Sequence, residues 1–107
     1  MIRGTTPTFT LTVGDSELDL SQASNVYVTV TQGNKRVTKT GSALTISGNV
    51  VSCYLSQTET LAFKAGQAAE IQVNWIYTEG SATKRAATDP KQIIVGFQLL
   101  PEVLPSV

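Results

Sequence analysis

Strict alternation of apolar and polar residues constrains this chain more than any other feature of its sequence. In the run PTFTLTV, the side chains of Phe9, Leu11 and Val13 alternate with those of threonines. The runs SNVYVTVTQ and AAEIQVNWIYT alternate in the same way. Because side chains two positions apart lie on the same face of an extended chain, each run predicts a half-buried β-strand. The apolar residues are therefore expected to be buried between sheets.

Residues that favour turns separate the alternating runs at short intervals. Gly33-Asn34 and Glu79-Gly80 are each flanked by strand-like sequence, and Ser47-Gly48-Asn49 is a third point of this kind. Glycine and asparagine tolerate the positive φ angles that tight hairpin turns require. About seven or eight short strands at this spacing predict an all-β antiparallel sandwich.

The segment SQTETLAFKAG interrupts this pattern between two alternating runs. Ser56 is followed three residues later by Glu59, which is the pattern of a capping box at the start of a helix. Isolated helices below about 12 residues are marginal in water, so we predict one helical turn near residues 56–63 that joins two strands. Two apolar side chains are expected to plug the end of the sandwich, and a glycine to let the chain reverse. The residues of this structural corner are Ser56, Glu59, Leu61, Phe63 and Gly66.

The size and charge of the chain limit its partners. A chain of 107 residues is expected to form one domain, and we assign residues 1–97 to the sandwich and residues 98–107 to a tail. Eight basic and eight acidic residues cancel, so no nucleic-acid partner is expected. The low charged fraction of 15% favours association between subunits, and we expect a homo-oligomer. No run approaches the roughly 18 apolar residues of a membrane span, so no membrane partner is expected.

The sequence offers little of the chemistry that enzymes use. It contains no histidine, which is the commonest general base and metal ligand. Its single cysteine, Cys53, excludes an intrachain disulfide and suits folding in a reducing cytoplasm. Cys53 occupies an apolar position of an alternating run, so a buried structural thiol is expected rather than a nucleophile. Because no acid–base pair can be named, we expect no enzymatic activity, no cofactor and no small-molecule substrate.

Charged residues near the turns allow two alternative ligand sites, one for calcium and one for phosphate or a glycan. Asp15, Glu17 and Asp19 could gather oxygen ligands for calcium, but their spacing lacks the glycine and terminal glutamate of a calcium-binding loop, and solvated side chains are expected instead. Basic residues beside two hairpin turns are expected to keep sheet edges apart, with a phosphate or glycan contact as the alternative. These basic residues are Lys35, Arg36, Lys39, Lys84 and Arg85.

The aromatic residues leave a sugar platform as a further alternative. Of the tyrosines, only Tyr27 and Tyr54 fall on the outward faces of their strands, while Tyr77 falls on an inward face. Trp75 is flanked by other inward-facing residues and is predicted to be the largest packing residue of the core.

The C-terminal sequence GFQLLPEVLPSV differs from the rest of the chain. Pro101 and Pro105 forbid an ordinary central strand there. The tail is expected to pack along its own domain, to dock on a neighbouring subunit or to fray. Its apolar residues are the best candidates in the chain for an assembly contact. They are Leu99, Leu100, Val103 and Leu104.

Several segments in fixed order point to a family. IRGTTPTFTLTV, DLSQASNVYVTVTQ, NVVSCYLSQTETLAFKAG, AEIQVNWIYTEGS and DPKQIIV cover nearly the whole chain. The sequence resembles a group of short proteins encoded by phages and prophages of Gram-positive gut bacteria. It is also similar, more distantly, to the N-terminal Ig-like domain of phage baseplate upper proteins. The residues that carry over are structural: Pro7, Phe9, Leu55, Leu61, Phe63, Gly66 and Trp75.

The resemblance implies an immunoglobulin-like β-sandwich with a structural part in the virion, in the tail or baseplate, and no catalysis. The expected partners are other virion proteins, and the expected location is the virion, with the bacterial host cytoplasm during assembly. The alternative is an adhesin-like or carbohydrate-binding module that meets a host surface through the hairpin tips at Gly33-Asn34 and Glu79-Gly80. Those tips are charged and lack a tryptophan, which favours the assembly module.

Overall fold

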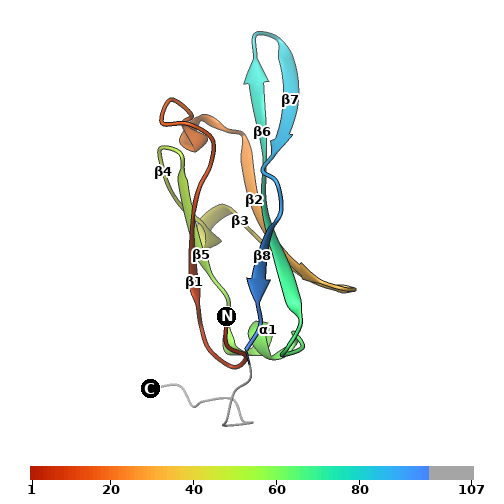
Figure 1. Ribbon diagram of the computed structural model, residues 1–107. Coiled ribbons are helices and arrows are strands. Elements are labelled where there is room, and N and C mark those ends of the chain that lie inside the picture. The colour runs from red at the N-terminus through yellow and green to blue at the C-terminus, as the bar shows by residue number, and fades with distance from the viewer. Residues whose placement is uncertain (97–107) are drawn as a thin grey trace.

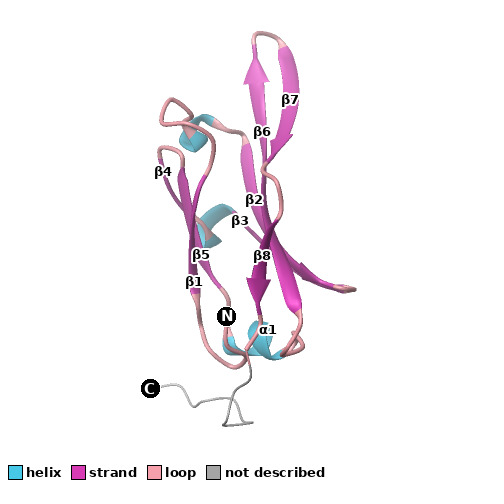
Figure 2. Cartoon of the chain, in the orientation of Figure 1, coloured by secondary structure: helices cyan, strands magenta, loops and turns pink. Residues whose placement is uncertain are grey.

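Two antiparallel sheets face each other in the computed structural model, which describes residues 1–96 (Figure 1, Figure 2). The smaller sheet has the order β1-β5-β4, with β1 at Thr8–Thr12, β5 at Val50–Tyr54 and β4 at Thr45–Ser47. The larger sheet has the order β3-β2-β6-β7, with β3 at Lys35–Thr40, β2 at Asn25–Gln32, β6 at Ala68–Glu79 and β7 at Ala82–Ala87. The remaining strand, β8 at Lys91–Ile94, also pairs with β6. The short helical elements are η1 at Leu20–Gln22, η2 at Gly41–Ala43 and α1 at Gln57–Leu61.

The order of the strands is that of an immunoglobulin-like sandwich. In that fold, strands B, E and D form one sheet and strands C, F and G the other, with C′ added beside C in some members. Taking β1 as strand B reproduces B-E-D in the smaller sheet and C′-C-F in β3, β2 and β6. Strand G is divided into β7 and β8, which pair in succession with the same edge of β6. The predicted all-β antiparallel sandwich is confirmed.

A short interruption divides β7 from β8 without releasing the chain from β6. The Thr88 amide donates to the Val73 carbonyl at 2.9 Å, and the Val73 amide donates to Thr88 Oγ1 at 3.0 Å. Pro90, which has no backbone donor, follows within the interruption. The threonine side chain thus replaces a ladder hydrogen bond at the one point where the backbone departs from the sheet.

The core consists of the inward residues of both sheets. Alternate residues of β2, β5 and the first half of β6 are buried, as the sequence pattern predicts. Cys53 is among them, and burial raises the pKa of its thiol. Trp75 differs from expectation, because it packs against the core but stays partly exposed. The largest fully buried side chain is Phe63.

The capping box predicted at the corner is present. Ser56 Oγ accepts from the Glu59 amide at 3.1 Å, and Glu59 Oε1 accepts from the Ser56 amide at 2.8 Å. Lys39 Nζ from β3 donates to the same carboxylate at 2.8 Å. Partial burial of this carboxylate opposes its ionisation, but the hydrogen bonds from Lys39 and Ser56 outweigh that effect and lower the pKa of Glu59. The corner is therefore tied both to itself and to the larger sheet.

The N-terminal residues clamp α1 from the other side. Arg3 donates from Nε to the Phe63 carbonyl at 2.6 Å and from Nη2 to the Leu61 carbonyl at 2.8 Å. The Gly4 amide donates to the buried Thr60 Oγ1 at 3.0 Å, and Thr60 Oγ1 donates to the Thr5 carbonyl at 2.9 Å. The two Arg3 bonds satisfy carbonyls at and just beyond the end of the helix, and the Thr60 hydroxyl links the helix to Gly4 and Thr5.

The loop after α1 is held by an amide side chain and a glycine. Gln32, buried at the end of β2, accepts from the Lys64 amide at 2.6 Å and donates to the Lys64 carbonyl at 2.8 Å. Gly66 has φ +82°, as the predicted reversal requires, and its amide donates to the Val95 carbonyl at 2.8 Å. Of the two predicted plugs, Phe63 is buried, whereas Leu61 is half-buried and lies against Gly4.

Replacing Phe63 with alanine tests whether the corner closes the core. Loss of a fully buried phenylalanine costs about 3–5 kcal/mol of unfolding free energy. Leu61→Ala is the matched control, and its half-buried position predicts a smaller loss. Denaturant titration measures both. A loss below about 1 kcal/mol for Phe63→Ala would contradict the role of this side chain as a plug.

Replacing Thr60 with valine tests the clamp between α1 and the N-terminal segment. Valine keeps the shape but leaves the Gly4 amide and the Thr5 carbonyl without this partner, which costs about 1–3 kcal/mol. Thr58→Val, at an exposed position of the same helix, is the control and should change stability by less than about 0.5 kcal/mol. Equal effects of the two substitutions in thermal or denaturant unfolding would show that the clamp contributes nothing.

Candidate functional site

The two sheets differ in length, and the difference leaves one end of the sandwich open. β6 has 12 residues, whereas β1 and β5 have 5 each. Beyond Ile76, which pairs with Asn25 of β2, β6 is paired only with β7. The resulting β6–β7 hairpin projects past the smaller sheet at the end of the molecule opposite α1 (Figure 1). Inward residues at this end of β6 therefore have no opposing strand.

A groove of about 400 Å³ lies where the opposing strand is missing. On the hairpin side, its wall is formed by Trp75, Tyr77, Thr78 and Ala86. On the other side, the wall is the loop between β1 and β2, which contributes Leu18, Asp19, Gln22 and Ala23. We call this feature the hairpin groove. Most of its lining is apolar or aromatic, so it can bind a ligand by burying apolar surface.

The pairing of β6 with β7 determines what the hairpin presents to the groove. Trp75 lies opposite Ala86, and Tyr77 lies opposite Lys84. Because directly opposed residues share a face, the small Ala86 leaves the tryptophan ring uncovered on its cross-strand side. Gly80, with φ +64°, forms the tight turn at the tip. The hairpin is therefore a two-stranded ribbon with two aromatic side chains on its inner face.

The opposite wall is fixed by turns that its acidic residues stabilise. Asp19 caps η1, since its carboxylate accepts from the Ser21 hydroxyl at 2.6 Å and from the Ser21 amide at 3.0 Å. These bonds lower the pKa of Asp19. Asp15 Oδ1 accepts from the Glu17 amide at 3.0 Å. Leu20 is fully buried, and its amide donates to the Gly48 carbonyl at 2.8 Å, so the loop is anchored to the β4–β5 turn.

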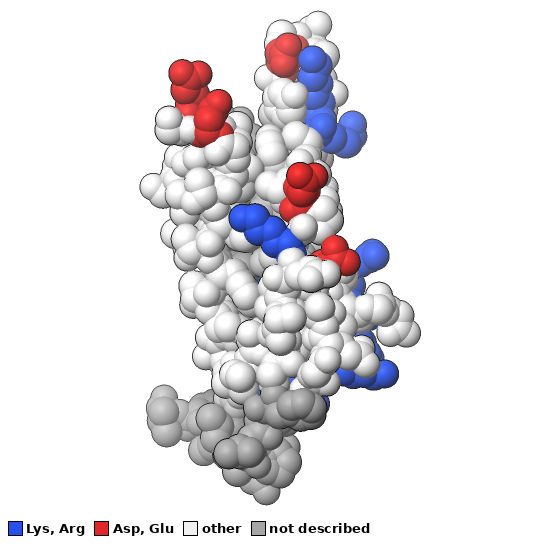
Figure 3. Space-filling model, in the orientation of Figure 1, with Lys and Arg blue, Asp and Glu red and all other residues white. Residues whose placement is uncertain are grey.

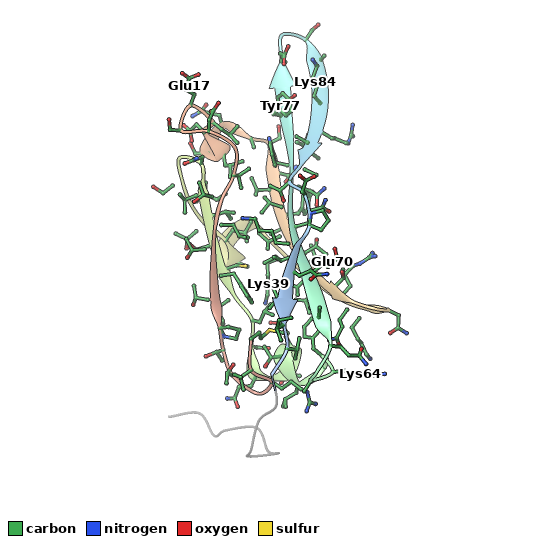
Figure 4. The ribbon with its side chains drawn as sticks, viewed as in Figure 1. Glu17, Lys39, Lys64, Glu70, Tyr77 and Lys84 are labelled. Carbon is green, nitrogen blue, oxygen red and sulfur yellow. The ribbon has the colours of Figure 1, made fainter. Side chains whose placement is uncertain are left out.

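Charges of opposite sign flank the groove. Figure 3 shows acidic side chains on the loop side and a mixture of basic and acidic side chains on the hairpin. Figure 4 places Glu17 on the loop, across from Tyr77 and Lys84 on the hairpin. Lys84 Nζ lies 3.4 Å from a Glu79 carboxylate oxygen in an exposed ion pair. The rim thus combines an acidic loop wall with a hairpin wall on which Lys84 and Glu79 form an ion pair.

The residues considered from sequence as ligand sites do not gather in one place. Lys35 and Arg36 lie at the exposed β2–β3 hairpin, far along the sheet from the β6–β7 hairpin (Figure 1). Lys39 is engaged by Glu59, and its Nζ lies 5.9 Å from the centre of the Tyr54 ring. The acidic residues of the β1–β2 loop are exposed, as expected, and residues 1–96 contain no group of three potential metal ligands.

The tyrosines are also dispersed. Tyr54 is exposed on the smaller sheet, Tyr27 is half-buried on β2, and Tyr77 lines the hairpin groove. A platform of three tyrosines is therefore absent from the part of the chain that the structure describes. Alternation places Trp75 and Tyr77 on the inward face and does not predict that they form a partly exposed pair. The relevant signal in the sequence is the length of the AAEIQVNWIYT run, because this strand is longer than the strands of the facing sheet.

The structure describes the predicted corner residues but not the residues predicted to form the tail contact. The corner residues form a structural joint at the closed end, distant from the groove (Figure 1). The predicted contact residues Leu99, Leu100, Val103 and Leu104 lie outside the described residues.

Comparison with known proteins leaves the chain without an assigned family. No family model matches the sequence, and a search of curated proteins finds no significant relative. Within residues 1–96, no helix has the length and apolar character needed to span a membrane.

Proposed function

We propose that this chain is a structural assembly module of a phage or prophage virion, associated with the tail or baseplate. In this proposal it binds other virion proteins and copies of itself. The observation that carries the proposal is the aromatic face of β6 that extends past the opposing sheet and lines an open groove. A sandwich closed at one end and open at the other offers a defined docking surface on an otherwise complete domain.

The virion assignment is supported by the family resemblance of the sequence. Its most specific pieces, RGTTPT and LSQTETLAFKAG, are the segments that build the clamped corner. A corner held by hydrogen bonds in this way suits a structural protein that keeps its neighbouring subunits in fixed positions. The free, buried thiol of Cys53 suits folding in the host cytoplasm before the particle is complete.

The C-terminal tail supplies the other half of the proposed contact. Two pairs of adjacent apolar residues, at positions 99–100 and 103–104, follow shortly after the sandwich in the sequence. A standard protein interface buries about 800 Å² on each partner, and its fully buried centre is more apolar than the rest of the protein surface. We therefore assign the assembly contact to Leu99, Leu100, Val103 and Leu104.

A carbohydrate-binding or adhesin-like function is the second candidate. It is favoured by Trp75 and Tyr77, which lie side by side on the wall of the groove near the Glu79-Gly80 tip. Aromatic rings with a polar edge are suited to ligands that are part apolar and part hydroxylated. A glycan array separates the two candidates, because an assembly module should show no saturable glycan binding.

Aspartate substitutions in the tail test the assembly function in the full chain. Wild-type protein should show a concentration-dependent mass above that of one 11.4 kDa copy in size-exclusion chromatography with light scattering. Leu99→Asp with Leu104→Asp should be monomeric, because charge at a buried contact is strongly unfavourable.

Ser42→Asp with Ser47→Asp adds the same charge at exposed positions and is the control. It should assemble as the wild type does, and circular dichroism should be the same for all three proteins. A wild type that stays monomeric, or a tail variant that assembles normally, would contradict the proposal.

A further inference from the structure

We propose that the hairpin groove receives residues 97–107 of a second copy of this chain, so that copies join head to tail. This inference rests on the assembly function proposed above and names the receiving site.

The groove and the tail are complementary in size and chemistry. The groove volume of about 400 Å³ lies within the usual range for ligand sites, roughly 300–1,000 Å³. Trp75, Tyr77 and Leu18 give it an apolar lining, and the tail carries four apolar side chains within six residues. The prolines of the tail restrict its backbone, which reduces the entropy that binding must remove.

The geometry of the sandwich makes the tail of the same copy a poor occupant. β8 runs antiparallel to β6 and pairs Ile94 with Ala68, so the chain reaches Gly96 while moving away from the groove. Along β6, Trp75 lies about 23 Å beyond Ala68 at roughly 3.3 Å per residue. Leu99 follows Gly96 by three residues and can reach only about 10 Å from it.

Leu104, eight residues after Gly96, could reach about 28 Å only if the chain reversed at once and ran fully extended. The tail of a neighbouring copy is not subject to this limit and can enter the groove from outside the molecule.

The charged rim favours one orientation of the tail. Glu102 is the only charged residue among positions 97–107. The loop wall carries Asp15, Glu17 and Asp19, which would repel it, whereas the inner face of the hairpin carries Lys84. Exposed ion pairs such as Lys84–Glu79 contribute little, so Lys84 can exchange Glu79 for Glu102 at low cost. Glu102 is therefore expected to face the hairpin.

The two ends that would meet both expose apolar surface. Ile94 is 68% exposed and Ile2 is 47% exposed, and both lie beside Gly96 where the tail begins. The groove occupies the opposite end of the molecule (Figure 1). Because the donor and acceptor surfaces differ, the contact is heterologous and repeats into a ring or a filament.

Mixing two assembly-deficient variants tests the inference. The groove variant Tyr77→Ser keeps an intact tail, and the tail variant Leu99→Asp with Leu104→Asp keeps an intact groove. Each should be monomeric alone, and an equimolar mixture should form complexes of two copies, because one complete contact remains. Ala86→Glu is a second groove variant that blocks the site opposite Trp75 without removing an aromatic ring. Melting curves establish that both groove variants are folded.

The single tryptophan gives a direct reading of groove occupancy. A synthetic peptide of residues 96–107 is titrated into the tail variant while Trp75 emission is recorded. A saturable blue shift is expected, with at least tenfold weaker binding to protein that also carries Tyr77→Ser. A peptide with serine at positions 99, 100, 103 and 104 is the control and should produce no shift. Response to an oligosaccharide panel but not to the peptide would overturn the inference in favour of a sugar ligand.

The outcomes separate this inference from the proposed function. If the tail variant is monomeric but both folded groove variants assemble as the wild type does, assembly through the tail stands and the groove assignment is wrong. If the tail variant itself assembles as the wild type does, both proposals fail.

Discussion

The difference in length between β6 and the strands that oppose it determines where this molecule is closed and where it is open. A sheet is stable in water when one of its faces is covered by another layer. Along β6 that condition holds from Ala69 to Val73, where the inward residues are buried. From Trp75 onward the opposing strands have ended, and only the β1–β2 loop approaches. The same alternating strand therefore supplies the core at one end and an open aromatic surface at the other.

Several hydrogen bonds and one ion pair gather around α1 at the closed end of the sandwich. Around α1, the capping box of Ser56 and Glu59 fixes the start of the helix, and Arg3 and Thr60 bind its last turn to the N-terminal segment. Lys39 extends this network to β3. These contacts hold the closed end together, while the opposite end of β6 projects past the facing sheet.

Sequence patterns predicted the local structure well and the open end poorly. Period-two alternation identified the strands, and the Ser56–Glu59 spacing with Gly66 identified the corner, because these signals depend on neighbouring residues alone. Trp75 was expected in the core, since its inward position is fixed by alternation. Whether an inward residue is covered depends on the length of a strand elsewhere in the chain, which no local pattern contains. The division of strand G into β7 and β8 depends likewise on a contact between Thr88 and Val73.

The proposed contact between Tyr77 of one copy and the tail of another can be tested by a photo-crosslink between isotopically distinct copies. Light and heavy full-length chains, each with a photoreactive phenylalanine analogue at position 77, are mixed, irradiated and digested with trypsin. Mixed-isotope products are expected that join the peptide containing position 77 to the peptide beginning at Gln92, with the crosslink between residues 99 and 104. Crosslinks confined to single copies, or joined to other parts of the neighbouring copy, would contradict it.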